Sequence, residues 1–418
     1  MPDSRHRTTI ALLSEAHRAT SSSSHTTYVD HVPPAVITRV AHSFASCARA
    51  TSDNEEASRP LAIAKDFTGT ISATRTRSAY ARGMSASMPQ RVAVIGAGSW
   101  GTTVASLVSM NTHTVLWARR DDVAQAISTT HHNPTYLPDV DLSPTLSATA
   151  SLKDAVTESD VIVMAVPSHG FRDILTTLVP HLAQGVPVVS LTKGLEPGSG
   201  LRMSEVVNEV LPDSPFAVLT GPNLAREIVE GQPAASVIAT RDAALARDLQ
   251  HAFNRPTWRM YTNNDVVGCE IAGVVKNVIA IGAGMAFGLG FGDNTRAALI
   301  TRGLAEITRL AVAMGARPET FAGLAGMGDL IATCASSMSR NNTVGRRLGQ
   351  GESLASIVES TSMVAEGVKS SAAVLDLAHT HDVEMPITEQ VVAVCHHGVS
   401  AADATRALMT RALKQEND

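Results

Sequence analysis

The chain is poor in aromatic residues and in net charge, and each shortage narrows the range of functions. Of its 418 residues only 4% are aromatic whereas 44% are apolar, so a buried core has to be built mainly from Ala, Val, Leu and Ile. The formal net charge of −5 gives no general attraction to nucleic acid or to a membrane surface. We expect no membrane span either, because no apolar run approaches the roughly 18 residues that a span needs.

Cysteine is also scarce. The four cysteines lie far apart, form no Cys-x-x-Cys pair and have no histidine at metal-ligand spacing; they are Cys47, Cys269, Cys334 and Cys395. This pattern is typical of a reducing compartment and argues against a structural metal, so we expect a cytoplasmic protein without one. The length of the chain allows two or three domains with a large core.

Residues 1–88 differ in composition from everything that follows. Ser and Thr are dense there, apolar periodicity is weak and arginines outnumber acids, which favours a disordered N-terminal extension. An Arg- and Ser-rich leader can also be a transit peptide, but acids such as Glu55 and Glu56 count against that. A third alternative is a mis-assigned start, because Met84 and Met88 lie just before the first expected strand. We favour an extension or a mis-assigned start over a targeting signal.

What the chain does contain is a glycine-rich turn between a short apolar strand and a helix. The expected elements are a strand at 92–95, a helix at 102–110 and a second strand at 114–117. In the G-x-G-x-x-G turn, Gly96 allows the tight bend, Gly98 lets the backbone approach a pyrophosphate, and Gly101 lets the helix lie close to the strand. The helix N-terminus would then face the phosphates. This βαβ unit predicts dinucleotide binding; the alternative is a glycine turn without a ligand.

The second strand ends in two basic residues where many NAD sites carry an acid. Arg119 and Arg120 follow it directly, and the first acid is Asp121. Two guanidinium groups can hold a 2′-phosphate in a bidentate way. We therefore predict that NADP(H) is accepted, alone or together with NAD(H). The alternative is a solvated basic loop.

Strands and helices alternate in the middle of the chain. Further apolar strands are expected at 161–166, 188–191, 216–219 and 235–239, with a helix at 171–178. Such strands indicate a parallel sheet covered on both faces. After about Thr262 the pattern changes to long helices, expected at 268–286, 295–314, 353–359, 368–379 and 387–396. We therefore predict a nucleotide-binding α/β domain over 89–264 and an all-helical substrate domain over 265–418.

Two lysines stand out in this arrangement. Lys193 lies in the loop after the strand at 188–191, where parallel strands deliver their loops to the cofactor crevice. Lys276 lies inside an otherwise apolar helix, where a buried ammonium is unfavourable unless it is paired. A catalytic lysine and a structural lysine that reaches the surface are both compatible with this position.

Together these motifs resemble the NAD(P)-dependent glycerol-3-phosphate dehydrogenases of the bacterial type. The resemblance covers 91 to about 410 and rests on the glycine turn and on the motifs at 117–120, 133–138, 192–194, 221–222, 275–277, 292–294, 339–341 and 364–367. It implies a Rossmann-type doubly wound parallel sheet followed by an all-helical domain of the 6-phosphogluconate dehydrogenase C-terminal type. It also implies reversible reduction of dihydroxyacetone phosphate to sn-glycerol 3-phosphate for phospholipid synthesis, with the active site between the domains.

The resemblance implies a role for each matching residue. The catalytic positions are Lys276 as proton donor and acceptor, Lys193 and Asp329. These three also bind substrate, together with Gly221, Asn223, Asn277, Ser339, Arg340 and Asn341. The cofactor positions are Gly96, Gly98, Ser99, Trp100, Gly101, Arg119, Arg120, Tyr136, Lys193, Ala225, Arg340, Val364 and Glu366. The chain departs from the pattern at Asn223, where the family often has Ser.

The chemistry of these residues agrees with those roles. Burial and a nearby Lys193 would lower the pKa of Lys276, so that it could give a proton to the developing alkoxide at neutral pH. A helix that opens at residues 339–341 would offer a hydroxyl, a guanidinium and free N–H groups to a substrate phosphate. The alternatives are a related two-domain reductase of a hydroxy acid or ketopantoate, and a non-catalytic NADP(H) sensor. We expect a small phosphate substrate; a homodimer is compatible with the sequence.

Overall fold

The structure is a computed structural model, and it describes residues 88–360, 365–413 and 415–416. The N-terminal extension expected over 1–88 lies outside the described residues except for Met88. The expected cofactor residue Val364 also lies outside them.

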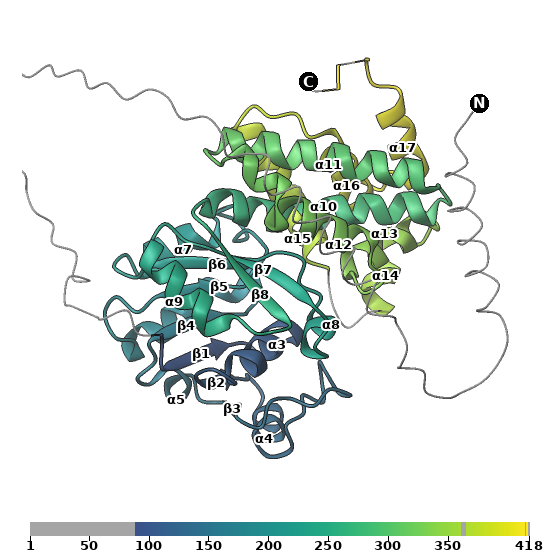
Figure 1. The fold of residues 1–418 in the computed structure, drawn as a ribbon. Helices are drawn as coiled ribbons and strands as arrows, with labels where there is room; N and C mark the ends of the chain where they lie inside the picture. Colours follow the sequence, from purple (N-terminus) through teal and green to yellow (C-terminus); the bar gives the residue numbers. More distant parts are fainter. Residues whose placement is uncertain (1–87, 361–364, 414, 417–418) are drawn as a thin grey trace, which may run out of the picture. The chain divides into compact units, whose positions relative to one another are not determined.

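The first half of the described chain forms a mixed eight-stranded sheet with the order β3-β2-β1-β4-β5-β6-β7-β8 (Figure 1). Its strands are β1 (Arg91–Ile95), β2 (His113–Trp117), β3 (Ser147–Thr149), β4 (Val161–Met164), β5 (Val188–Ser190), β6 (Phe216–Thr220), β7 (Ala234–Ala239) and β8 (Trp258–Asn263). Six neighbouring strands, β3, β2, β1, β4, β5 and β6, are parallel. The continuous apolar runs predict this arrangement for all of them except β3. Strand β7 runs antiparallel to β6, and β8 pairs with β7 in parallel.

The expectation that all strands run parallel was therefore wrong at one side of the sheet, and β3 and β8 were not predicted. Strand β8 is an edge strand in which buried Trp258 and Met260 alternate with exposed Arg259 and Tyr261. Such alternation is typical of a strand buried on one face only. A search for continuous apolar runs finds strands that are buried on both faces and misses β8.

Helices cover both faces of this sheet. They are α3 (Ser99–Val108), α4 (Asp121–Thr130), α5 (Leu152–Val156), α6 (Phe171–Leu178), α7 (Met203–Val210), α8 (Ala225–Val229) and α9 (Ala243–Phe253). In β1, Val92 and Val94 pack into the cluster that contains α3 and α9, whereas Ala93 and Ile95 pack into the cluster that contains α6 and α7. The doubly wound Rossmann-type arrangement is thus confirmed.

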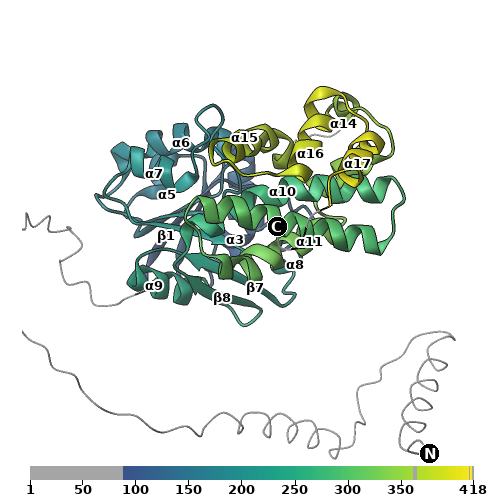
Figure 2. The same cartoon turned by 90° about the horizontal axis from the view of Figure 1, so that it is seen from above.

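The second half of the described chain is helical, as predicted. Its helices are α10 (Val266–Gly288), α11 (Asp293–Ala313), α12 (Asp329–Ala335), α13 (Arg340–Gly349), α14 (Leu354–Ser360), α15 (Glu366–Thr380), α16 (Pro386–His397) and α17 (Ala401–Met409). Helix α10 contacts α11, α12, α13, α15 and α16, and Figure 2 shows α10 and α11 side by side. The fold therefore places α10 at the centre of the helical domain.

Helix α10 is long and apolar enough to cross a membrane by length and composition alone, with a mean hydropathy of 1.7 over its most apolar window. The expectation that no segment approaches this length was therefore wrong. Of that window, 94% is buried against other parts of the described chain. This burial is what a central core helix shows, because it has to be apolar on every side.

Candidate active site

The glycine turn is shaped by close backbone contacts. Gly96 has φ of +120°, and a Cβ there would lie 2.6 Å from the Ala165 carbonyl oxygen. A Cβ at Gly101 would lie 2.0 Å from the Gly96 carbonyl oxygen, so α3 can pack this close only without a side chain. Gly98, in contrast, has nothing within 4 Å of a would-be Cβ, and no side chain caps the start of α3. The turn thus leaves its open side and the helix N–H groups available to an anion.

A loop fastened by Asn133 lies beside this turn. The buried Asn133 amide donates to the Ala97 carbonyl at 2.9 Å and to the Thr102 hydroxyl at 2.8 Å, and its oxygen accepts from the backbone N–H of Tyr136. The Ser99 hydroxyl in turn donates to the Tyr136 carbonyl at 3.4 Å. The structure therefore brings the predicted cofactor residues Ser99 and Tyr136 together. Asn133 begins the motif at 133–138, but its place in that motif provided no reason to assign it a role.

The two arginines after β2 lie in different surroundings, although both are exposed. Arg120 precedes α4 and donates from Nε to Asp122 at 3.0 Å, with a second, shorter contact to the same carboxylate. This hydrogen-bonded ion pair raises the pKa of Arg120. No ion pair involving Arg119 is seen within the described ranges. The guanidinium of Arg120 would therefore have to share its hydrogen bonds between Asp122 and any bound phosphate.

Two lysines from different domains meet at one carboxylate. Lys276 Nζ donates to Asp329 Oδ1 at 2.5 Å, and Lys193 Nζ donates to Asp329 Oδ2 at 2.7 Å. Lys193 also donates to the Gly221 carbonyl at 3.1 Å, which places that predicted substrate position in the same cluster. Asp329 and Lys276 are both buried. The structure thus unites the three predicted catalytic residues.

Different elements deliver these side chains. Lys193 follows β5, whereas Lys276 lies midway along α10, and Asp329 begins α12 directly after a π-helical turn at Leu324–Gly328. One turn further along α12, the buried Thr333 hydroxyl accepts a second hydrogen bond from Lys276 at 2.7 Å. Sequence reasoning missed Thr333. The signal that could have found it is its i+4 spacing from Asp329 on one helical face.

Burial lowers the pKa of Lys276 to about 8. Its removal from water is the largest cause; the Asp329 carboxylate opposes this shift, and the neighbouring Lys193 ammonium adds to it. A lysine with this pKa exchanges a proton readily near neutral pH.

A second hydrogen-bonded network lies behind the lysines. The Asn277 amide reaches the Lys193 carbonyl at 3.4 Å, and the Asn277 oxygen accepts from the Asn341 amide at 2.9 Å. The Asn341 oxygen then accepts from the Gly367 N–H at the start of α15. The predicted substrate residues Asn277 and Asn341 are thus linked to the lysine cluster.

Ser339 and Arg340 open α13, as the sequence predicts. The Ser339 hydroxyl accepts from the Asn342 N–H at 3.3 Å and caps the helix, while Arg340 is exposed. At the start of α15, Glu366 is half-buried beside Gly194, and burial raises the pKa of its carboxyl. Its Oε2 is buried without a hydrogen-bond partner among the described residues. The charges of His169, Lys369 and Arg340 oppose this effect of burial on the pKa of Glu366.

An ion-pair cluster ties α10 to the nucleotide-binding domain. The buried Glu270 carboxylate accepts from Arg202 Nη1 at 2.9 Å, from the Ser204 N–H at 2.8 Å and from the Ser204 hydroxyl at 2.6 Å. Glu270 precedes Lys276 on the same helix. The cluster therefore fixes where Lys276 lies relative to the sheet.

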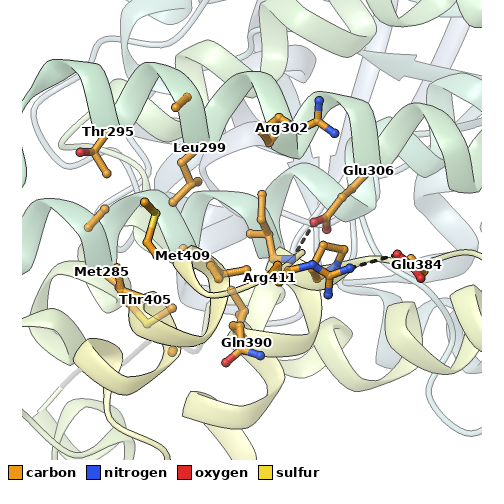
Figure 3. A pocket seen from close by; sticks show the side chains of 18 of the residues that line it. Met285, Thr295, Leu299, Arg302, Glu306, Glu384, Gln390, Thr405, Met409 and Arg411 are labelled. Atoms are coloured by element: carbon orange, nitrogen blue, oxygen red, sulfur yellow. Dashed lines mark hydrogen bonds and ion pairs between the residues drawn. The ribbon is translucent and has the colours of Figure 1, made fainter. Parts of the chain in front are cut away.

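The helical domain also contains a cavity of about 730 Å³ between α10, α11, α16 and α17 (Figure 3). None of the predicted site residues lines it. Two of the charged groups drawn there are already paired, since Glu306 accepts from the Ile387 N–H and Arg411 contacts Glu384. The cavity is therefore separate from the lysine cluster.

Several observations fit a bound dinucleotide. The indole N–H of Trp100 and the amide nitrogen of Asn223 are buried near the glycine turn and lack hydrogen-bond partners among the described residues. Buried donors without partners are unusual in native structures and point to an absent ligand. A glycine turn on a Rossmann-type sheet, with a paired lysine of lowered pKa from a helical domain, is the arrangement of a two-domain nicotinamide-dependent dehydrogenase.

Comparison with known proteins identifies the family. Residues 91–246 match the N-terminal model, and residues 265–406 the C-terminal model, of NAD-dependent glycerol-3-phosphate dehydrogenase. The chain therefore belongs to the NAD-dependent glycerol-3-phosphate dehydrogenase family. It is 53% identical over 329 residues to a Sphingopyxis alaskensis protein named glycerol-3-phosphate dehydrogenase (NAD(P)+) 2, covering 79% of this chain and 99% of that protein.

Solved structures give the same result. The glycerol-3-phosphate dehydrogenase of Coxiella burnetii is 36% identical, with a TM-score of 0.74, and the match covers 77% of this chain and 99% of that one. A ketopantoate reductase from Ralstonia eutropha, at 17% identity and a TM-score of 0.50 over 75% of this chain and 99% of that one, shares the fold alone.

Proposed function

We propose that this protein catalyses the reversible NAD(P)H-dependent reduction of dihydroxyacetone phosphate to sn-glycerol 3-phosphate. The observation that carries the proposal is the carboxylate of Asp329 shared by Lys193 and Lys276, in a chain that belongs to this dehydrogenase family. The two ammonium groups and one carboxylate leave a net positive charge where a carbonyl oxygen becomes an alkoxide.

Lys276 is the proposed proton donor. When bound, the reduced nicotinamide supplies the hydride that the substrate carbonyl accepts. Lys276 Nζ then gives a proton to the alkoxide oxygen, and Asp329 and Thr333 hold that nitrogen in place through hydrogen bonds of 2.5 and 2.7 Å. In the opposite direction the neutral Lys276 amine takes the hydroxyl proton. A pKa of about 8 suits both directions.

The start of α13 is the proposed site of the substrate phosphate. Arg340 offers a guanidinium there, and Ser339 and Asn341 offer a hydroxyl and an amide at a helix N-terminus. Gly221, Asn223 and Asn277 complete the substrate contacts in this proposal. Lys193 contacts both substrate and cofactor, because it lies in the loop after β5 and also reaches Asp329.

The cofactor is proposed to lie across the glycine turn. Residues that would hold it are Gly96, Gly98, Ser99, Trp100 and Gly101 at the pyrophosphate, Arg119 and Arg120 at the 2′-phosphate, and Tyr136, Lys193, Ala225, Arg340, Val364 and Glu366 around the rest. NADP(H) and NAD(H) are both accepted under this proposal.

The proposal extends to organisation and setting. We assign residues 89–264 to the cofactor domain and 265–418 to the substrate domain. We further propose a cytoplasmic enzyme that acts as a homodimer and supplies glycerophospholipid synthesis.

A substrate panel tests the proposed function. NADPH and NADH oxidation would be followed with dihydroxyacetone phosphate, ketopantoate and a 2-oxo acid. We expect kcat/KM to favour dihydroxyacetone phosphate by roughly 100-fold or more, because the other two lack the phosphate that α13 would hold. Turnover only with the carboxylates would identify a related reductase instead. Cofactor binding without turnover on any of them would identify a sensor.

A further inference from the structure

A chain of hydrogen bonds runs behind the loop that follows β6. The indole N–H of Trp258, in β8, donates to the Ser236 hydroxyl at 2.8 Å, and that hydroxyl donates to the Asn223 side-chain oxygen at 2.5 Å. Ser236 and Trp258 have no exposed surface. The two side chains thus form a fixed support for Asn223.

The direction of this chain agrees with the chemistry of its members. An indole nitrogen can only donate, so the Ser236 hydroxyl has to accept from Trp258. The single hydroxyl proton of Ser236 is then free to point at Asn223, and only the amide oxygen can accept it. Trp258 and Ser236 thus hold the Asn223 oxygen toward β7, and the amide nitrogen lies on the other side.

The nitrogen end of Asn223 is buried and has no hydrogen-bond partner among the described residues. Leaving a buried amide donor unpaired is unfavourable, so such a group is normally paired with protein, water or ligand. Two successive hydrogen bonds that hold the oxygen end in place leave this nitrogen as a donor for another group.

The position of Asn223 shows what it faces. Two residues before it, the Gly221 carbonyl accepts from Lys193 Nζ at 3.1 Å. Two residues after it, the Ala225 carbonyl accepts from the Thr103 hydroxyl of α3 at 3.2 Å. Asn223 thus lies between the lysine cluster and the helix that follows the glycine turn. A ligand that spans these two places would pass its side chain.

We infer that Trp258 and Ser236 are positioning residues, which fix the Asn223 amide so that its nitrogen donates to an acceptor oxygen of a bound ligand. This inference rests on the proposed function for the identity of the ligand. The oxygen belongs either to the carboxamide or ribose of the nicotinamide end, or to the substrate, because both would lie between Lys193 and α3.

A double-mutant cycle tests the inference. Trp258→Phe keeps an aromatic ring against Trp100, whose ring centroid lies 5.7 Å away, but removes the N–H that binds Ser236. Asn223→Leu removes the donor. The cycle comprises both single variants and the double variant, with the Kd of NADPH from calorimetry and the KM of dihydroxyacetone phosphate as readouts. Ser236→Ala replaces Trp258→Phe in the cycle if the latter lowers the melting temperature strongly.

We expect the effects of Trp258→Phe and Asn223→Leu on ligand binding to be strongly coupled, although the two side chains do not contact each other through a hydrogen bond. Asn223→Leu should weaken binding of one ligand by roughly 2- to 12-fold, the range for one neutral hydrogen bond. Trp258→Phe should weaken binding of the same ligand by a smaller factor, and it should have no further effect in a protein that already carries Asn223→Leu. An increase in the Kd of NADPH, measured without substrate, assigns the oxygen to the cofactor. An increase confined to the KM of dihydroxyacetone phosphate assigns it to the substrate.

Two results would overturn the inference. In the first, the fold-losses in binding of the two single variants multiply in the double variant, which indicates a merely structural role for Trp258. In the second, the Asn223→Leu variant binds both ligands like the wild type. The calorimetric arm needs no turnover. A wild-type protein that fails to reduce dihydroxyacetone phosphate would therefore refute the proposed function while the cycle on NADPH could still be read.

Discussion

Lys276 illustrates how the fold makes an ordinary side chain chemically useful. Inside α10 its ammonium is removed from water, which favours the neutral amine, while a single carboxylate shared with Lys193 keeps the charged form accessible. If each lysine had its own carboxylate, the pKa of Lys276 would remain higher. Burial and the neighbouring Lys193 ammonium thus lower the pKa of Lys276, and the shared Asp329 carboxylate limits that shift.

The pKa of Lys276 predicts opposite pH profiles for the two directions of the reaction. Reduction needs the ammonium form, so its kcat/KM should fall as pH rises through about 8; oxidation needs the neutral amine, so its kcat/KM should rise up to about 8. Steady-state rates in both directions between pH 6 and pH 10 would check this, over roughly the range where a shifted lysine titrates.

Two variants serve as matched controls for that profile. Lys193→Met removes the like charge and should move the midpoint to higher pH, whereas Asp329→Asn removes the opposing carboxylate and should move it to lower pH. Parallel profiles in the two directions, or midpoints unmoved by both variants, would show that another group titrates.

The arginines after β2 give a prediction about the choice of cofactor. Arg119→Ala and Arg120→Ala together should raise the KM for NADPH by roughly 10- to 150-fold more than that for NADH, because charge-assisted contacts to the 2′-phosphate are lost. The Asp122→Asn variant releases Arg120 from its ion pair and should lower the KM for NADPH. Steady-state kinetics with both cofactors measure this, and equal changes for the two would refute it.

Sequence reasoning found the residues whose type conflicts with their surroundings. Lys276 was identified because an ammonium inside an apolar helix requires an explanation, and Lys193 because it lies in the loop after a parallel strand. Thr333 and Ser236 were missed, since a hydroxyl in a helix or strand carries no such conflict. Their roles arise only when the fold brings them to Lys276 and Asn223.

Among the helices, α16 shows how a buried charge can support an element from another part of the chain. No side chain of its own caps α16; instead Glu306 of α11 accepts from the Ile387 N–H at 2.6 Å and from the Thr388 N–H at 3.2 Å. Burial nevertheless raises the pKa of Glu306 to about 7 from an ordinary value of 4.5. The favourable contacts thus offset only part of the unfavourable burial.

This raised pKa predicts a pH-dependent stability. Between about pH 4.5 and pH 7 the folded state retains a proton on Glu306 that the unfolded state releases. The contribution of the protonated Glu306 to the free energy of unfolding is therefore lost as pH rises through about 7. Glu306→Gln cannot ionise. Its unfolding free energy relative to the wild type should therefore rise by up to about 3 kcal/mol between pH 5 and pH 8. Denaturant unfolding at both values measures this, and a constant difference would contradict it.

How well each element could be predicted depended on its surroundings. Strands β1 and β4 are buried on both faces, and α10 is buried along most of its length, so their apolar runs identified them. The seven-residue α12 was missed because it follows a π-helical turn and has no long periodic pattern. The reversal at β7 could not be predicted, since strand direction depends on the connection and not on the composition of the strand.

At the scale of the whole molecule, helix α10 of the helical domain makes several of the described contacts between the two domains, including contacts with β6. Helix α10 carries Glu270, which binds Arg202 and Ser204 near α7, and Lys276, which meets Lys193 through Asp329. The site is therefore assembled only when the two domains pack together.

The matched region suggests what the enzyme requires. The family models cover 91–246 and 265–406, and a relative that aligns with 79% of this chain is itself covered to 99%. A variant that begins at Met84 should therefore keep the melting temperature and kcat of the full chain. Calorimetry and steady-state assays compare the two directly. A large loss in either would show that residues 1–83 contribute to the folded enzyme.

The most direct test is a single-turnover measurement of NADPH oxidation with saturating dihydroxyacetone phosphate, in the wild type and in Lys276→Met. Methionine keeps the apolar length of the side chain and removes the proton. The rate should fall by about 10²- to 10⁴-fold, the contribution of a general acid, while NADPH still binds. A variant that retains more than about a tenth of the wild-type rate would contradict the assignment and make Lys193 the next candidate.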